Sequence, residues 1–278
     1  MHATGFTCAN RSTQRPVRAI ARNRRDAPMK SKALAGVLRS LRTYHGDRER
    51  ERAMDRLYAR YLGAGDLAFD VGAHVGDRVS SFRRLGCRVV ALEPLPLCQR
   101  LLRLIHGRDP QVSLVAAAAG SHDGRACLHV NQANPTGCTL SAAFVRASCG
   151  APGWEGQQWD THIEVPVVTL DQLIASHGLP RFAKIDVEGC ELEVLRGLTH
   201  RVPALSFEFT TIRRQAAHDC VALLERLGAY RFDVALGESQ QLAFGEPVGA
   251  KDLAAWLDAL PDAANSGDVY AVTVGITG

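Results

Sequence analysis

The sequence contains no long hydrophobic segment. Its longest uninterrupted apolar runs, such as residues 114–119, fall far short of the roughly 20 residues that a membrane-spanning helix needs. The apolar core of a secretory signal peptide is also missing near the N-terminus. The sequence therefore predicts a protein that neither spans a membrane nor is secreted.

Cysteine patterns typical of metal sites or disulfide frameworks are absent as well. The eight cysteines are scattered, with no Cys-x-x-Cys pair and no cysteine or histidine cluster at the spacing of zinc ligands. Such usage predicts free thiols in a reducing compartment, for which the cytoplasm is the simplest choice, and no bound metal.

Charge is distributed unevenly along the chain. Residues 1–60 contain 15 Lys and Arg against 5 Asp and Glu, whereas residues 61–278 contain 18 against 24. A nucleic-acid-binding domain needs a basic face at its binding site, so the acidic body predicts no nucleic-acid partner. Residues 1–30 are polar and Arg-rich, and we expect a disordered basic extension there. A targeting segment or a start at Met29 is the alternative.

What the sequence does contain is typical of a folded globular protein, with 46% hydrophobic and 22% charged residues. Between residues 33 and 62, apolar side chains recur at steps of three and four, which predicts two amphipathic helices separated near Gly46. We expect residues 31–62 to form a helical cap and residues 63–278 to form the main domain.

From residue 66 onward, short apolar runs alternate with stretches of helical spacing. Strands are expected at residues 67–71, 88–92, 112–118, 182–187, 205–209, 230–234 and 269–274. Helices are expected at residues 77–85, 96–106, 192–198, 213–227 and 251–257. This alternation predicts one doubly wound α/β domain with parallel strands and right-handed crossovers.

Residues 124–168 interrupt the alternation with a segment rich in Gly, Pro and Asn. Two β-like runs, 126–130 and 162–168, enclose it. Because long insertions in compact domains are usually functional, we expect a lid or an acceptor-binding region here.

The turn after the first expected strand contains Gly72 and Gly76. In α/β sheets this turn is a ligand site, and the helix that follows offers free N–H groups to an anion. Ala73 and His74 leave the spacing without the middle glycine of the dinucleotide fingerprint, which favours a carboxylate over a diphosphate. A purely structural turn is the alternative.

Carboxylates follow two further strands. Glu93 ends the second strand, where a carboxylate can accept hydrogen bonds from both hydroxyls of a ribose. Asp186 and Glu188 follow the strand after the topological switch, and they would share one face if that strand continued. Either could accept a substrate proton. The alternative, strongest for Glu191, is that these groups only stabilise a helix N-terminus.

Together the motifs resemble those of the FkbM family of S-adenosylmethionine-dependent methyltransferases. Over residues 65–235 they read, in order, Phe69-Asp70-Val71-Gly72-Ala73-His74-Val75-Gly76-Asp77, Leu92-Glu93-Pro94, Val168-Thr169-Leu170-Asp171, Lys184-Ile185-Asp186-Val187-Glu188-Gly189-Cys190-Glu191-Leu192, Leu195-Arg196-Gly197 and Phe207-Glu208. The resemblance implies a Rossmann-like, class I methyltransferase sheet of seven strands, mostly parallel, with a reversed hairpin at its end.

The resemblance also implies S-adenosylmethionine as cofactor and O-methylation of a sugar, glycan or polyketide-type metabolite. The residues that would bind the cofactor are Asp70, Gly72, Ala73, His74, Gly76, Glu93 and Asp186. Among them Glu93 would hold the ribose and Asp186 would face the sulfonium. The loop 134–141 would cover the donor, although Cys138-Thr139 replaces the serine-rich segment usual there.

An aliphatic hydroxyl is a poor nucleophile, so a nearby base should assist its methylation. We rank Asp186 first and Glu188 second as catalytic residues, with Glu208 and His74 as further candidates. Glu208 could instead pair with a cation such as Lys184. In the insertion, Trp154 and Trp159 could stack on a sugar ring or simply pack under the loop.

Two other functions remain open. An NAD(P)-dependent oxidoreductase is disfavoured by the missing glycine and by the lack of an evident hydride-transfer pair. A catalytically silent member that binds the cofactor or a partner protein is disfavoured by the intact motif residues.

Overall fold

In the computed structural model, residues 31–275 are described, and the expected basic extension lies outside them. The described part begins with α1 (Ser31–His45) and α2 (Arg48–Tyr58). Asp47 caps α2, because its carboxylate accepts hydrogen bonds from the backbone N–H groups of Glu49 and Arg50. The helices therefore separate near Gly46, as the sequence predicts. None of the helices in the described range is long and apolar enough to cross a membrane.

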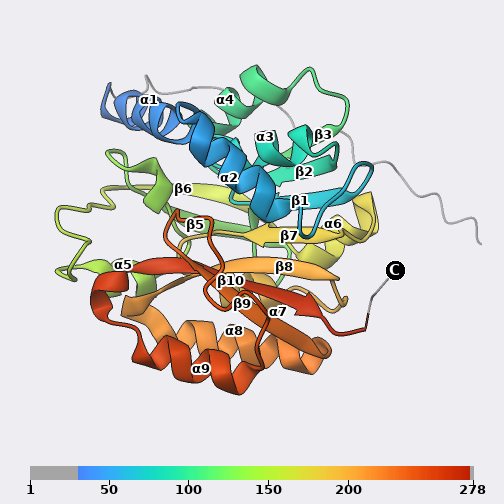
Figure 1. Cartoon of the computed structure of the whole chain (residues 1–278). Helices are drawn as coiled ribbons and strands as arrows, with labels where there is room; N and C mark the ends of the chain where they lie inside the picture. Colours follow the sequence, from blue (N-terminus) through green and yellow to red (C-terminus); the bar gives the residue numbers. More distant parts are fainter. Residues whose placement is uncertain (1–30, 276–278) are drawn as a thin grey trace, which may run out of the picture.

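Seven strands form the central sheet (Figure 1). They are β1 (Leu67–Val71), β2 (Arg88–Leu92), β3 (Val112–Val115), β7 (Phe182–Ile185), β8 (Ala204–Thr210), β9 (Tyr230–Leu236) and β10 (Ser266–Thr273). Their order is β3-β2-β1-β7-β8-β10-β9, and only β10 runs antiparallel to its neighbours. The predicted seven-stranded, mostly parallel sheet with a reversed hairpin is confirmed. Its switch point lies between β1 and β7.

Helices cover both faces of this sheet. They are α3 (Asp77–Arg84), α4 (Pro96–His106), α6 (Leu170–His177), α7 (Glu191–Arg196), α8 (Arg214–Leu227) and α9 (Ala250–Ala259). Successive strand residues point to opposite faces, so Phe69 packs with α6 to α9 while Ala68 packs with α2 to α4. Tyr58 of α2 contacts Phe82 of α3 edge to face, with ring centroids 4.8 Å apart. The helix α2 is thus part of the main core.

The insertion builds a second, smaller sheet, in the order β4-β6-β5, from β4 (Ala118–Ala119), β5 (Gly124–Val130) and β6 (Thr161–Val168). The expected strand 112–118 is therefore wrong in its second half. In the central sheet, β3 ends at Val115, because Ala118 and Ala119 pair with β6 instead. The insertion also contains the short helices η1 (Pro135–Gly137) and α5 (Ala142–Ser148), which were not predicted because one or two turns show no periodicity.

The expected strand 182–187 also ends early, at Ile185. Asp186 still donates its backbone N–H to Val71, but the chain then turns sharply, with φ of 54° at Glu188 and 86° at Gly189. A left-handed conformation cannot continue a strand. The carboxylates of Asp186 and Glu188 therefore do not share a strand face, and the turn itself decides where each one points.

Candidate active site

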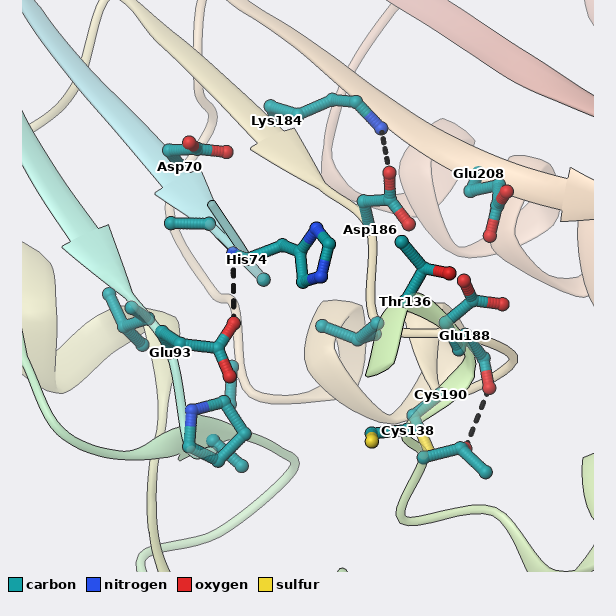
Figure 2. Close-up of a pocket in the computed structure, with 18 of the residues that line it drawn as sticks. Asp70, His74, Glu93, Thr136, Cys138, Lys184, Asp186, Glu188, Cys190 and Glu208 are labelled. Carbon is teal, nitrogen blue, oxygen red and sulfur yellow. Dashed lines mark hydrogen bonds and ion pairs between the residues drawn. The ribbon is translucent and has the colours of Figure 1, made fainter. Parts of the chain in front are cut away.

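Two adjoining cavities lie at the carboxyl ends of β1, β2, β7 and β8. The first is lined by the turn after β1, by Glu93 and by loop residues between 135 and 140 (Figure 2). The second is lined by residues of the insertion, of the loop after β9 and of the start of β10. Asp186, Glu188, Glu208 and Glu238 line both cavities. The cavities therefore meet at four carboxylates.

Most of the predicted site residues meet in the first cavity. Its lining includes Asp70, Gly72, Ala73, His74, Glu93, Asp186 and Glu188. Gly76 is not part of the lining. It is the N-cap of α3, with φ of 82°, and a Cβ there would press on Leu102 and His106 of α4. The glycine at this position serves the packing of the turn against α4.

Gly72 joins the turn after β1 to the turn after β7. Its φ is 92°, in the left-handed region, and a Cβ would overlap with the backbone carbonyl oxygen of Asp186. Only glycine allows the two chains to approach this closely. The position of Asp186 in the cavity therefore requires a residue without a side chain at position 72.

The carboxylate of Glu93 is buried at the end of β2 and is only 7% exposed. Its oxygens accept backbone N–H groups from His74, at 2.8 Å, and from Leu95, at 2.7 Å. Burial raises the pKa of Glu93 to about 7, although these two hydrogen bonds oppose the shift. Each oxygen keeps capacity to accept another hydrogen bond, so a pair of hydroxyls could bind here.

Two buried atoms of β1 and of the turn after it, both from residues that line the first cavity, have no partner among residues 31–275. They are Oδ2 of Asp70 and Nε2 of His74. Burial, followed by the charge of Asp77, raises the pKa of Asp70 to about 7, while burial lowers the pKa of His74 to about 4. The imidazole is therefore neutral at neutral pH. Because unpartnered buried polar atoms are rare, these two favour a polar ligand in the cavity.

Lys184 is buried under the site, with 1% exposure. Its Nζ donates to Oδ2 of Asp186 at 3.1 Å and to Oδ1 of Asp268 at 2.8 Å. Burial alone would lower the pKa of Lys184, but the two carboxylates raise it well above its usual value. The ion pair orients Asp186. Lys184 is not hydrogen-bonded to Glu208, the partner that the sequence suggested for it.

The carboxylates of Asp186, Glu188 and Glu208 each have an oxygen within 4.8 Å of the others, on the side of the cavity opposite Glu93 (Figure 2). Burial, followed by the neighbouring carboxylates, raises the pKa values of Glu188 and Glu208 well above their usual range. Oε2 of Glu208 is buried without a partner among the described residues. This group can hold protons, and its geometry would also suit a divalent cation, which prefers oxygen ligands. The sequence predicted no metal because that reasoning considered only Cys and His spacing.

Glu191 has a structural role. Its Oε1 accepts the backbone N–H groups of Val187 and Gly189, both at 3.1 Å. These bonds stabilise the turn that presents Glu188. The hydroxyl of Thr139 in the insertion donates to the backbone carbonyl of Glu188 at 2.7 Å and ties the loop to the same turn.

The sequence missed one wall of the site, which consists of Tyr44, Arg78 and Glu238. Tyr44 of α1 lines both cavities, and the guanidinium of Arg50 lies 4.9 Å from its ring centroid. Arg50 and Arg78 both bond to Asp77 and to Glu238, at distances of 2.7 to 3.1 Å. An isolated Arg or Glu in a polar segment gives no sequence signal, so this network could not be predicted.

Comparison with known proteins identifies one family. The family described as "Methyltransferase FkbM domain" matches residues 70–234. Among solved structures, the chain is similar to a TehB-like SAM-dependent methyltransferase from Corynebacterium glutamicum, with 11% identity, 87% of this chain and 97% of that chain covered, and a TM-score of 0.43. It is also similar to an O-methyltransferase from Bacillus cereus in complex with SAH, with 11% identity, 88% and 91% covered, and a TM-score of 0.43. Likenesses this distant carry no functional argument. No curated protein sequence matches the chain.

Proposed function

This chain belongs to the FkbM family of S-adenosylmethionine-dependent methyltransferases, and on that premise we propose that it methylates a hydroxyl oxygen of a sugar, glycan or polyketide-type acceptor. The observation that carries the proposal is the meeting of two cavities at Asp186, Glu188 and Glu208. One cavity suits the donor, the other suits the acceptor, and groups able to accept a proton lie between them.

The first cavity fits the donor. Glu93 would accept the two ribose hydroxyls, since both of its oxygens are held in place by backbone N–H groups. The unpartnered atoms of Asp70 and His74 are available for polar groups of the methionine part. When bound, S-adenosylmethionine supplies a methyl group activated by a positively charged sulfur.

The shared carboxylates supply the base. Oδ2 of Asp186 is bonded to Lys184, whereas Oδ1 has no hydrogen-bond partner among the described residues. In this proposal Oδ1 accepts the proton of the acceptor hydroxyl. Positioning contributes the rest of the catalysis, because the donor carbon is already activated.

Methyl transfer from ¹³C-labelled S-adenosylmethionine tests the function. The full chain is incubated with sugars, oligosaccharides and hydroxylated polyketides, and carbon NMR distinguishes O-methyl from N-methyl products. We expect a new O-methyl signal. Products labelled only on nitrogen contradict the proposal, and donor binding without any transfer supports a catalytically silent protein. A parallel reaction with a chelator shows whether the carboxylate group needs a metal.

Replacing Glu93 by Ala should weaken binding of S-adenosylhomocysteine about 5- to 150-fold, which corresponds to about 1–3 kcal/mol for polar groups left unpaired. Calorimetry on the purified protein measures the change. Glu164→Ala is the matched control, because Glu164 is an exposed carboxylate on β6. Equal affinities of the two variants would rule out the ribose role of Glu93.

Binding of S-adenosylhomocysteine should also depend on pH. Hydroxyl donors need the ionised carboxylate of Glu93, whose pKa is raised to about 7. Affinity should be constant above this pKa and fall as pH decreases through it, by up to about tenfold per unit, because a proton competes with the ribose. In Glu93→Gln the affinity should depend less steeply on pH, because only Asp70, whose pKa is also raised to about 7, still titrates in this range. A flat wild-type profile between about pH 5 and pH 8 contradicts this expectation.

A further inference from the structure

The second cavity has a volume of about 280 Å³ and lies next to the proposed donor cavity. Segments that are far apart in the sequence line it. They include the insertion around Trp154, the loop that contains Glu238, and the chain from Asn265 to the start of β10. Glu238 and Asn265 lie outside the segment that matches the family, whereas Trp154 and the three carboxylates Asp186, Glu188 and Glu208 lie within it.

Polar atoms in the lining lack partners. Nε1 of Trp154, Nε of Arg78, Oδ1 of Asn265 and Oε2 of Glu208 are all buried without a hydrogen bond among the described residues. They comprise two N–H donors and two oxygens. A buried polar atom without a partner costs free energy, so four in one place indicate a polar ligand. A polyol matches this set, because each hydroxyl both donates and accepts.

The charge of the lining excludes anionic ligands. Five carboxylate side chains contribute to it, namely Asp186, Glu188, Glu208, Glu238 and Asp268. Arg78 is the one Lys or Arg side chain in this lining, and its charge is balanced by Asp77 and Glu238, while its Nε–H has no hydrogen-bond partner among the described residues. Asp186, Asp268 and Glu238 already balance the charges of Lys184 and Arg78, so a phosphate, sulfate or carboxylate group would be desolvated here without an unpaired cation.

Apolar surface is limited mainly to two aromatic rings. Trp154 lies edge to face with Phe144, with centroids 5.0 Å apart, and Tyr44 also lines the cavity. Asn134, Thr136, Gln157 and Ser266 add polar groups. A few aromatic rings among many polar groups suit a sugar ring better than an extended hydrocarbon.

We propose that the second cavity receives a neutral, polyhydroxylated sugar unit, that Trp154 and Asn265 help to select it, and that phosphorylated or carboxylated sugars are excluded. The inference rests on the proposed function and narrows its acceptor class. It separates neutral glycans from nucleotide sugars, uronic acids and polyketides.

Ligand-detected NMR on the full chain saturated with S-adenosylhomocysteine tests this selection. The probes are methyl glucoside, glucose 6-phosphate, glucuronate and cyclohexanol. We expect the neutral glycoside to bind and the two anionic sugars to bind at least tenfold more weakly. Equal or tighter binding of an anionic sugar, or binding of cyclohexanol alone, overturns the inference.

Two variants locate the binding. Trp154→Phe keeps an aromatic ring but removes the N–H donor, and Asn265→Ala removes the amide. Each should weaken binding of the glycoside about fivefold or more without changing the affinity for S-adenosylhomocysteine. Trp256→Phe, on α9 and against Phe244, is the control. If all three variants bind the glycoside alike, the second cavity is not its site.

The outcomes distinguish this inference from the proposed function. If labelled methyl reaches oxygen only on apolar or anionic acceptors, the function holds and the sugar selection fails. If neutral sugars bind as expected but label is transferred only to nitrogen, the selection holds and the assignment of O-methylation fails.

Discussion

Replacing Asp186 by asparagine is expected to lower kcat by about 10²- to 10⁴-fold, the usual contribution of a general base. Asparagine cannot accept the hydroxyl proton, and it leaves Lys184 with only Asp268 as a carboxylate partner. The neutral product S-adenosylhomocysteine should bind with unchanged affinity. Binding of the positively charged donor should weaken, because a negative charge near the sulfonium is lost. Kinetics with the identified acceptor measure kcat, and calorimetry measures the affinities for S-adenosylhomocysteine and S-adenosylmethionine.

The control for this variant is Asp219→Asn, on the exposed side of α8. A kcat for Asp186→Asn within about threefold of the control would remove Asp186 from the chemistry, since a general base contributes far more. Glu188→Gln provides a second comparison. If it lowers kcat by much more than Asp186→Asn does, Glu188 is the base. Thermal melting shows whether the change at Lys184 has affected folding.

Replacing Gly72 by alanine should destabilise the fold by about 3 kcal/mol or more, because the change combines an unfavourable φ with overpacking. The new Cβ would overlap with the carbonyl oxygen of Asp186, and neither backbone segment is free to move. A loss of this size lowers Tm by about 6–12 °C in a chain of this length. Binding of S-adenosylhomocysteine should fall at least tenfold, because the turn that lines the first cavity is displaced.

Gly65→Ala separates the cost of the unfavourable φ from the cost of overpacking. Gly65 has φ of 89°, close to that of Gly72, but its added Cβ would meet nothing within 4 Å. It should therefore show only the backbone cost, about 1 kcal/mol. Equal melting temperatures for the two variants would mean that close approach to Asp186 is not what requires a glycine at position 72.

Local patterns predicted most strands and helices, because a parallel sheet covered on both faces needs short apolar runs separated by amphipathic helices. The helix 96–106 agrees with α4 at both ends, since Pro96 starts it and the apolar spacing is regular. The predicted and observed elements agreed less well where a segment could pair with either of two sheets. Ala118 and Ala119 are as apolar as a strand of the central sheet, yet they pair with β6 of the insertion.

By itself the sequence determined the sheet and brought Gly72, Glu93 and Asp186 to one site. Each follows a strand directly, and the carboxyl ends of parallel strands meet at one edge. Only the tertiary structure decided that Glu208 joins Asp186 and Glu188, that Tyr44 forms a wall, and that Trp154 lines a second cavity. These side chains come from segments far apart in the chain. Their proximity depends on strand order and on the path of the insertion, which no local pattern encodes.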